Sequence, residues 1–460
     1  MRPHRFASLL LLASGCWPLA LSAQPPVRSG PMLGHTTHRT AVLWVQTMAP
    51  AEVAVAYRPV EQDTTGATRP ATGGRATVRT GEDHVARLVL SHLEPGTRYA
   101  YDLLIDGVEA ERPYPLEFTT QPLWQHRADP PAFTVAVGSC YYANEPVYDR
   151  PGRPYGGDPA IFARIAALNP DVMLWLGDNV YLREVDWWSP EGIAHRYGHA
   201  RAEPALQPLL ATAAHYATWD DHDYGPNDSD RSYILKDAAL ETFQRYWANP
   251  SYGVGGVPGV FTQFQWGDAD FFLLDDRYHR APNRAPDSAR TVLGEGQLRW
   301  LLDALTYSRA PFKVVVLGGQ VINPVPVFET YAAIAPAERE RLIAEITARE
   351  IEGVLFLSGD RHHTELLRLE RPGAYPLYDF TSSPLTSGAS NYPTREDSPE
   401  RDNPLRVPGT LVTERHNFGT LTFEGPRNAR TLTLRTYDAT GALLWEHRIA
   451  EAELELPDED

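Results

Sequence analysis

Short runs of alternating apolar and polar residues fill the first part of the chain, from residue 27 to residue 122. Turn residues separate these runs at the close intervals that are typical of β-sandwiches. We therefore expect an all-β domain over 27–122. Its expected strands are residues 40–47, 51–59, 75–80, 86–93, 97–107 and 116–122.

The apolar pattern changes after residue 132. Longer apolar runs now alternate with segments of helical periodicity, which predicts a layered α/β domain with a substantially parallel sheet flanked by helices. The expected strands are 132–140, 171–181, 215–221, 270–276, 312–320 and 353–360, and the expected helices are 158–170, 236–247, 294–307 and 337–350. Antiparallel strands at 418–426 and 430–449 would make the sheets mixed, so we place this domain at 132–450.

Three segments carry more specific signals. Residues 92–107 resemble the tyrosine-corner segment of fibronectin type III-like sandwiches. Residues 121–131 are polar and end in two prolines, which indicates a linker. The helix at 158–170 is expected to begin with Asp158 as its N-cap and Pro159 in its first turn.

Length and charge limit the classes of function. A chain of 460 residues suggests two to three domains. The net charge of −17 disfavours nucleic acid or an anionic membrane as the main partner. A small anionic substrate is still compatible with this charge, because a bound cation can reverse the local field.

Residues 1–23 have the pattern of a secretory signal peptide. Arg2 and Arg5 lie within the first residues, an apolar run follows, and Ala23 ends an acceptable cleavage site. We expect a periplasmic or secreted protein, with lipid attachment at Cys16 as the alternative. No other run reaches the roughly eighteen apolar residues that a membrane-spanning helix needs.

Reactive side chains follow four of the expected strands. Cys140 ends the first, Asp178 and Tyr181 follow the second, Asp221 lies after the third, and Asp360 follows the strand at 353–358. Strand ends in an open α/β sheet face the ligand crevice, so these groups would converge from distant parts of the chain. Thiol, phenol, carboxylate and imidazole are all metal-ligand types, and the mixture suits more than one ion.

Each of these groups has an ordinary explanation when it is taken alone. A buried cysteine is usually a small hydrophobe, and the acidic run at 217–230 could be a solvated loop. Four such groups at the same position after a strand favour a metal site instead. Within the acidic run, Asp220 and Asp223 are expected to hold the loop by hydrogen bonds.

An ordered set of motifs resembles one family, the PhoD-like alkaline phosphatases of the calcineurin-like metallophosphoesterase superfamily. The matching segments are "VGSC", "LGDNVY", "TWDDHDYGPND", "LLDDRYHR", "LGGQV", "LSGDRHHTEL" and "TSSPLTSG", which follow the family's order between residues 135 and 388. The N-terminal sandwich matches as well. The resemblance implies a metallophosphoesterase domain that hydrolyses phosphoric esters.

The resemblance also implies a metal centre. Cys140 and Tyr181 match the thiolate and tyrosinate that bind Fe³⁺, and Asp178 matches the carboxylate that bridges iron to Ca²⁺. The remaining matching ligands are Asp221, Asp360 and His362. Carboxylates suit Ca²⁺, although Zn²⁺, Mn²⁺ or Mg²⁺ in its place stays open.

Five further residues are candidates for contact with the substrate. His222 and Asn227 match positions beside a metal ligand and near bound phosphate, and we assign catalysis to them. Arg183 and Arg361 are candidate phosphate contacts, as is Arg277, although surface ion pairs are the commoner role of arginine.

The expected function is hydrolysis of phosphate monoesters or diesters by a metal-activated hydroxide. The alternatives are a specialised phospholipid or cell-wall phosphodiesterase and a non-catalytic extracellular binding protein. Two features depart from the family pattern. Arg2 and Arg5 are not adjacent, so no twin-arginine signal is present, and Trp187 and Trp188 follow Tyr181 as a possible recognition site for an organic leaving group or as a packed loop.

Overall fold

The computed structural model describes residues 27–60, 73–152 and 154–457. The predicted signal peptide at 1–23, with Cys16, lies outside the described residues. No helix within the described ranges is long and apolar enough to cross a membrane.

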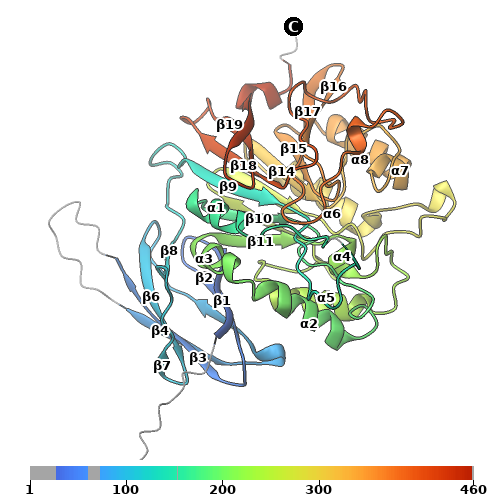
Figure 1. Cartoon of the computed structure of the whole chain (residues 1–460). Coiled ribbons are helices and arrows are strands. Elements are labelled where there is room, and N and C mark those ends of the chain that lie inside the picture. The colour runs from blue at the N-terminus through green and yellow to red at the C-terminus, as the bar shows by residue number, and fades with distance from the viewer. Residues whose placement is uncertain (1–26, 61–72, 153, 458–460) are drawn as a thin grey trace, which may run out of the picture.

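Two antiparallel sheets form the N-terminal domain (Figure 1). One sheet has the order β1 (Val27–Thr36), β2 (Ala41–Thr47), β5 (Val85–Leu90), and the other has the order β4 (Gly74–Arg79), β3 (Glu52–Pro59), β6 (Arg98–Ile105), β7 (Val108–Glu109), with β8 (Glu117–Thr119) also on β6. Every second residue of β6 is buried, as expected for a strand with one face on a core. The Tyr99 hydroxyl accepts a hydrogen bond from the Glu94 backbone N–H at 2.8 Å, which is the upstream backbone contact of a tyrosine corner.

The first sheet of the larger domain has parallel and antiparallel halves. Its order is β11 (Ala214–Thr218), β10 (Val172–Leu176), β9 (Phe133–Gly138), β18 (Asn417–Glu424), β19 (Thr431–Asp438), β20 (Leu443–Ala450). The strands β11, β10 and β9 are parallel, whereas β18, β19 and β20 follow antiparallel.

The second sheet has a parallel centre with an antiparallel strand at each edge. Its order is β12 (Thr262–Trp266), β13 (Ala269–Leu273), β14 (Phe312–Leu317), β15 (Val354–Ser358), β17 (Ala374–Thr381), β16 (Glu365–Arg371). The four inner strands are parallel, and β12 and β16 pair with their neighbours in the antiparallel direction. The expected mixed α/β layers are therefore present, but each sheet is less parallel than the apolar pattern indicated.

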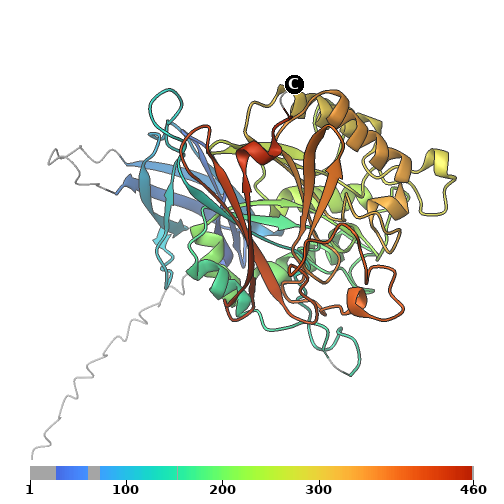
Figure 2. The same ribbon diagram turned by 90° about the horizontal axis from the view of Figure 1, so that it is seen from above.

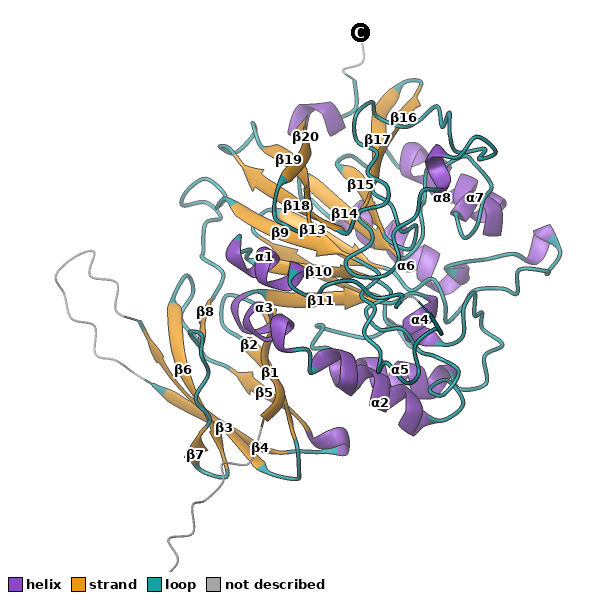
Figure 3. Ribbon diagram, viewed as in Figure 1, coloured by secondary structure: helices purple, strands orange, loops and turns teal. Residues whose placement is uncertain are grey.

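Helices pack against both sheets (Figure 3). Their bounds are α1 (Ile161–Ala167), α2 (Pro190–Arg201), α3 (Gln207–Thr212), α4 (Asp221–Tyr224), α5 (Lys236–Tyr246), α6 (Gly294–Tyr307), α7 (Tyr331–Ile334) and α8 (Pro336–Ala348). On β10, Met173 and Trp175 pack with α1, α2, α3 and α5, while Leu174 and Leu176 belong to the core shared with the second sheet. In the view from above, α6, α7 and α8 lie on the side away from the N-terminal domain (Figure 2).

The start of α1 differs from its prediction. Asp158 accepts a hydrogen bond from the Ala160 N–H at 2.9 Å, but Ala160, not Asp158, is the N-cap, and the helix begins at Ile161. The reason is a tighter turn before the helix, in which the Phe162 N–H donates to the Pro159 carbonyl. Asp158 therefore closes this turn and caps no helical N–H.

The two domains are joined by a direct interface along β1. The Thr36 N–H donates to the Tyr216 hydroxyl at 3.2 Å, and the His35 N–H donates to the Ala248 carbonyl at 3.0 Å. At Gly34, an added Cβ would lie 2.3 Å from the Ala248 Cβ. The expected linker takes part as well, because the Gln121 amide donates to the Thr36 and Gln265 carbonyls.

Candidate metal centre

The reactive residues occupy equivalent places in the two sheets. Cys140, Asp178, Asp220 and Asp360 each lie two residues beyond the last residue of a strand, β9, β10, β11 and β15 respectively. The strand ends of both sheets meet at this edge, so the residues come together although they are far apart in the chain. Within the first sheet, the parallel pairing of Leu176 with Thr218 and of Trp175 with Gly138 brings these strand ends to nearly the same level.

Four of the predicted ligands have left-handed backbone conformations. The φ angles are 60° at Cys140, 53° at Asp178, 61° at Asp360 and 55° at His362. Residues other than glycine rarely adopt this conformation, and such strain gathers at functional sites where the surroundings hold it. The conformations turn the chain sharply at the end of each strand, and no sequence pattern indicated them.

The first group of ligand atoms contains sulfur, oxygen and nitrogen. Ligand atoms of Cys140, Asp178 and His362 lie within 4.8 Å of one another. The Tyr181 hydroxyl lies 3.1 Å from His362 Nε2. His362 Nδ1 lies 2.6 Å from the Gly388 carbonyl, which requires a proton on Nδ1 and leaves Nε2 as the coordinating nitrogen. Cys140, Asp178, Tyr181 and His362 are thus brought together.

Two further groups are built on carboxylates. Asp178, Asp221 and His222 form one group, and Asp178, Asp220 and Asp360 form another, each with ligand atoms within 4.8 Å of one another. Asp178 is common to all three groups. A carboxylate shared by several groups could hold more than one cation.

Without a cation, burial and the neighbouring negative charges disfavour the anionic forms of three candidate ligands. Burial, and next the charges of Cys140 and Asp221, raise the pKa of Asp178 well above its ordinary value. Burial, and then the Glu329 carboxylate, raise the pKa of Asp360 to about 6. Burial also raises the pKa of the Cys140 thiol to about 11. A bound cation favours the anionic forms of all three groups, so the donor set fits metal ions.

Unpaired polar atoms support the same fit. Among the described residues, Asp221 Oδ1, Asn179 Oδ1 and His222 Nδ1 are buried atoms with no hydrogen-bond partner. Buried polar atoms are almost always paired. Carboxylate and amide oxygens in this position suit a hard cation such as Ca²⁺.

The two predicted catalytic residues lie at different depths. The His222 ring stacks on the Tyr181 ring with centroids 4.2 Å apart, and its backbone N–H donates to Asp178 Oδ1 at 3.2 Å. Burial lowers the pKa of His222, although Asp221 opposes this. Asn227 is exposed in the loop after α4.

The three arginine candidates differ in how their charges are paired. The Arg183 Nε is a buried donor without a partner among the described residues. Arg277 donates to Asp220 at 2.6 Å and contacts Glu329, and Arg361 pairs with Glu400 at 2.6 Å. Arg183 Nη2 lies 3.4 Å from the exposed Glu184 carboxylate, so Arg183 has a longer and more exposed ion pair than Arg277 and Arg361.

Asp220 and Asp223 hold the acidic loop. Asp220 accepts from Arg277, while Asp223 accepts from the Asn179 N–H at 3.0 Å and the Asp220 N–H at 3.0 Å. Of the two tryptophans after Tyr181, Trp187 is half-buried and its carbonyl accepts from the Tyr233 hydroxyl at 2.6 Å. The Trp188 side chain is exposed.

Comparison with known proteins identifies the family. A family model described as PhoD-like phosphatase matches residues 135–434. The chain belongs to the PhoD-like phosphatase family. The family that the sequence motifs indicated is therefore confirmed. Residues 24–123 match a second family, described as a domain of unknown function.

Relatives of this PhoD-like phosphatase are distant in sequence. Alkaline phosphatase D of Bacillus subtilis (strain 168) is 22% identical over 393 residues, which are 70% of this chain and 65% of the relative, so the chain spans a little less than two thirds of the relative's length. A solved structure described as PhoD is similar to this chain, with a TM-score of 0.72 and 18% sequence identity. The match covers 93% of this chain and 92% of the PhoD chain. A purple acid phosphatase from yellow lupin (Lupinus luteus) seeds has a TM-score of 0.63 at 12% identity, over 94% of this chain and 77% of its own. These likenesses confirm the mixed α/β fold.

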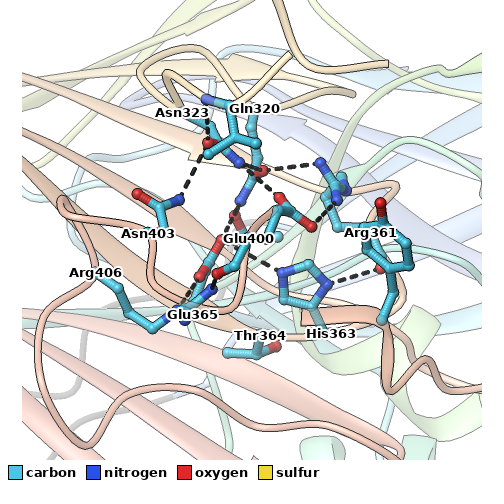
Figure 4. A network of polar contacts seen from close by, with 12 residues as sticks. Gln320, Asn323, Arg361, His363, Thr364, Glu365, Glu400, Asn403 and Arg406 are labelled. Atoms are coloured by element: carbon cyan, nitrogen blue, oxygen red, sulfur yellow. Dashed lines mark hydrogen bonds and ion pairs between the residues drawn. The ribbon is translucent and has the colours of Figure 1, made fainter. Parts of the chain in front are cut away.

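A buried polar network of this family member surrounds Arg361 and His363, which follow β15 in the chain (Figure 4). Asp360 and His362 are candidate ligands, whereas the residues between and after them, Arg361 and His363, bond to the network. Arg361 pairs with Glu400, and His363 Nε2 lies 3.3 Å from Glu365. The network's labelled members are Gln320, Asn323, Arg361, His363, Thr364, Glu365, Glu400, Asn403 and Arg406.

Glu400 links its own loop to two others by hydrogen bonds. Its carboxylate accepts from Arg361 and from the Asn323 amide at 2.9 Å, and its side chain is completely buried. Ion pairs anchor Glu329 in a similar way, since it contacts both Arg277 and Arg280. Sequence reasoning missed both glutamates, because neither lies after a strand or in a motif that suggests metal chemistry.

Proposed function

We propose that the chain is a secreted, metal-dependent phosphoesterase that hydrolyses phosphate monoesters, diesters or both. The observation that carries the proposal is the convergence of the three ligand groups on Asp178, at the edge where the strand ends of both sheets meet. Membership of the PhoD-like phosphatase family supports the same reaction. The sequence pattern of residues 1–23 supports export.

The proposed ligands divide by chemistry. Cys140 and Tyr181 would hold Fe³⁺, because thiolate and phenolate oxygen stabilise a trivalent ion, and Asp178 would bridge to Ca²⁺ or to Zn²⁺, Mn²⁺ or Mg²⁺ in its place. Asp221, Asp360 and His362 complete the set. When bound, the cations supply Lewis-acid polarisation of the phosphate oxygens and acidify a water molecule.

The chain's own residues orient the reaction. Gly388 fixes the protonation of His362, and Asp178 positions His222 through the backbone N–H of His222. We propose that His222 holds the proton that passes to the leaving oxygen, that Arg183 binds a phosphate oxygen through its unpaired Nε, and that Asn227 contacts the phosphate from the rim. Arg361 is proposed as a phosphate contact on sequence grounds only, since Glu400 already pairs with it.

Two proposals concern the rest of the chain. The upstream contact of Tyr99 supports a fibronectin type III-like identity for the N-terminal sandwich. The polar, proline-ended segment at 121–131 supports domain limits at 27–122 and 132–450. No nucleic-acid partner is proposed, because the net charge is −17.

The decisive experiment combines metal analysis with two substrates. Purified protein is assayed for iron and calcium and for hydrolysis of p-nitrophenyl phosphate and its bis-ester. Asp178→Asn should lower both activities by at least about a hundredfold, because one variant weakens three ligand groups at once, and Cys140→Ala should lose iron. Asp287→Asn, whose side chain is 83% exposed, is the matched control. Full activity of Asp178→Asn, or of Cys140→Ala with unchanged iron, would refute the corresponding assignment.

A further inference from the structure

Phe328 combines exposure with a strained backbone. Its side chain is 61% exposed, and its φ angle is 44°, in the left-handed region that bulky residues rarely adopt. Because most of its side chain is exposed, the Phe328 ring gains little free energy from burial. Strain of this kind points to function when the surroundings enforce it.

The surroundings of Phe328 belong to the metal centre. On one side Glu329 contacts Arg277 and Arg280, and its carboxylate lies within 4.8 Å of ligand atoms of Asp221 and Asp228. On the other side the Val327 N–H donates to the Val325 carbonyl at 2.9 Å. The ion pairs that hold Glu329 therefore also hold Phe328 at the edge of the site.

The Phe328 ring has two partners from other parts of the site. Tyr392 meets it edge to face, with centroids 4.7 Å apart at an interplanar angle of 78°. The guanidinium carbon of Arg361 lies 5.4 Å from its ring centroid, and Arg361 lies between the proposed ligands Asp360 and His362. The aromatic pair Phe328 and Tyr392 thus joins the β14–α7 and β17–β18 connections beside the metal centre.

We propose that Phe328 and Tyr392 bind a flat aromatic ring in the organic part of the phosphoester substrate. The proposal rests on the proposed function, since the charged and polar ligands of the centre account for the phosphate only. An edge-to-face pair with one exposed ring leaves an aromatic surface on which a substrate ring stacks. A net charge of −17 argues against an anionic bilayer as the occupant.

The test compares substrates that differ in a ring but have similar leaving groups. The substrates are 2-phenylethyl phosphate and butyl phosphate, together with their methyl diesters. Phe328→Gly removes the ring and also suits the left-handed backbone, so this variant keeps the fold. Phe328→Trp keeps an aromatic surface, and Phe328→Leu keeps an apolar side chain without one. Tyr307→Ala removes a ring that is 85% exposed at the end of α6 and serves as the matched control.

Phe328→Gly should lower kcat/KM for the phenylethyl esters about tenfold, mainly through KM, and leave the butyl esters within about twofold. Phe328→Trp should retain the preference for the phenylethyl esters, and Phe328→Leu should lose this preference. Tyr307→Ala should leave the preference unchanged. Equal losses on both esters, or retention of the preference by Phe328→Leu, would overturn the proposal.

A failure of the proposed function is distinguishable from a failure of this site. If the wild-type protein hydrolyses none of the esters, the proposed function fails, and binding of phenylphosphonate and methylphosphonate decides the ring site. Tighter binding of phenylphosphonate that is lost in Phe328→Gly supports the site. Equal binding of the two phosphonates overturns it.

Discussion

Four proposed ligands, Cys140, Asp178, Asp360 and His362, are held in left-handed conformations. Glycine would adopt the same conformation without strain, but it would supply no ligand atom. The chain instead places glycine beside two of them. At Gly359 an added Cβ would lie 2.7 Å from the Leu176 carbonyl, and at Gly177 it would lie 2.7 Å from the Asp220 Cβ. Close approach of neighbouring loops therefore excludes a side chain at Gly359 and Gly177, directly beside two of the strained residues.

A histidine away from the centre gives a pH-dependent prediction. His215 is completely buried, accepts from the Trp175 indole N–H at 3.0 Å, and has a pKa that burial lowers to about 3. In the unfolded chain its pKa is about 6.5, so below pH 6.5 the unfolded state binds more protons. Stability from neutral His215 is complete above pH 6.5 and falls as the pH approaches 3.

His215→Gln keeps one donor and one acceptor and removes this titration. The variant should lose less stability between about pH 6 and pH 4, by up to about 1.4 kcal/mol per pH unit. Denaturant unfolding at several pH values measures the slope, with exposed His126→Gln as the control. Parallel slopes for His215→Gln and the wild-type protein would contradict the assignment.

At the scale of elements, the apolar patterns predicted the strands that bear ligands and most of the longer helices. Continuous buried runs such as those of β10 and β14 are unambiguous. The strand β1, the edge strand β12, the hairpin of β16 and β17, and the helices α2 and α3 were not predicted. The helix α2 shows why, since Arg196, Tyr197 and Arg201 are buried in it by tertiary contacts that a local pattern does not contain.

The candidate site was predictable for the same physical reason. Each proposed ligand follows a strand closely, and chemistry at strand ends is visible in the sequence. The polar residues that support the ligands come from long connections instead. Glu400 lies 39 residues from its partner Arg361, and no local rule relates the two.

Replacement of Glu400 tests whether the β17–β18 connection positions the candidate ligands Asp360 and His362 through Arg361. Glu400→Gln preserves shape but leaves the buried Arg361 without a carboxylate. Because Arg361 lies between Asp360 and His362, we expect metal affinity to fall about 10- to 100-fold, as measured by metal titration. Glu446→Gln, in a partly exposed pair with Arg435, is the control. A lower melting temperature with unchanged metal affinity would assign Glu400 to stability alone.

At the scale of the whole molecule, the β1 interface predicts that the two domains unfold together. Gly34→Val would force a side chain against Ala248, and overpacking of this kind costs about 1–3 kcal/mol. We expect calorimetry to show one transition for the wild-type protein and two for the variant. At Gly81 an added Cβ would meet only the Val85 carbonyl, at 4.0 Å, so Gly81→Val should leave one transition. One shared transition in Gly34→Val would mean that the domains are coupled elsewhere.

The hydrogen bond between Ser383 Oγ and Cys140 Sγ, at 3.2 Å, spans 243 positions of the chain. At the usual rate of synthesis, roughly 10–50 s separates the appearance of these two residues. During that interval the thiol lacks both the Ser383 donor and the complete ligand set. Oxidation before assembly is thus a hazard of production, and it ends only when the segment that contains Ser383 has been made and folded onto Cys140.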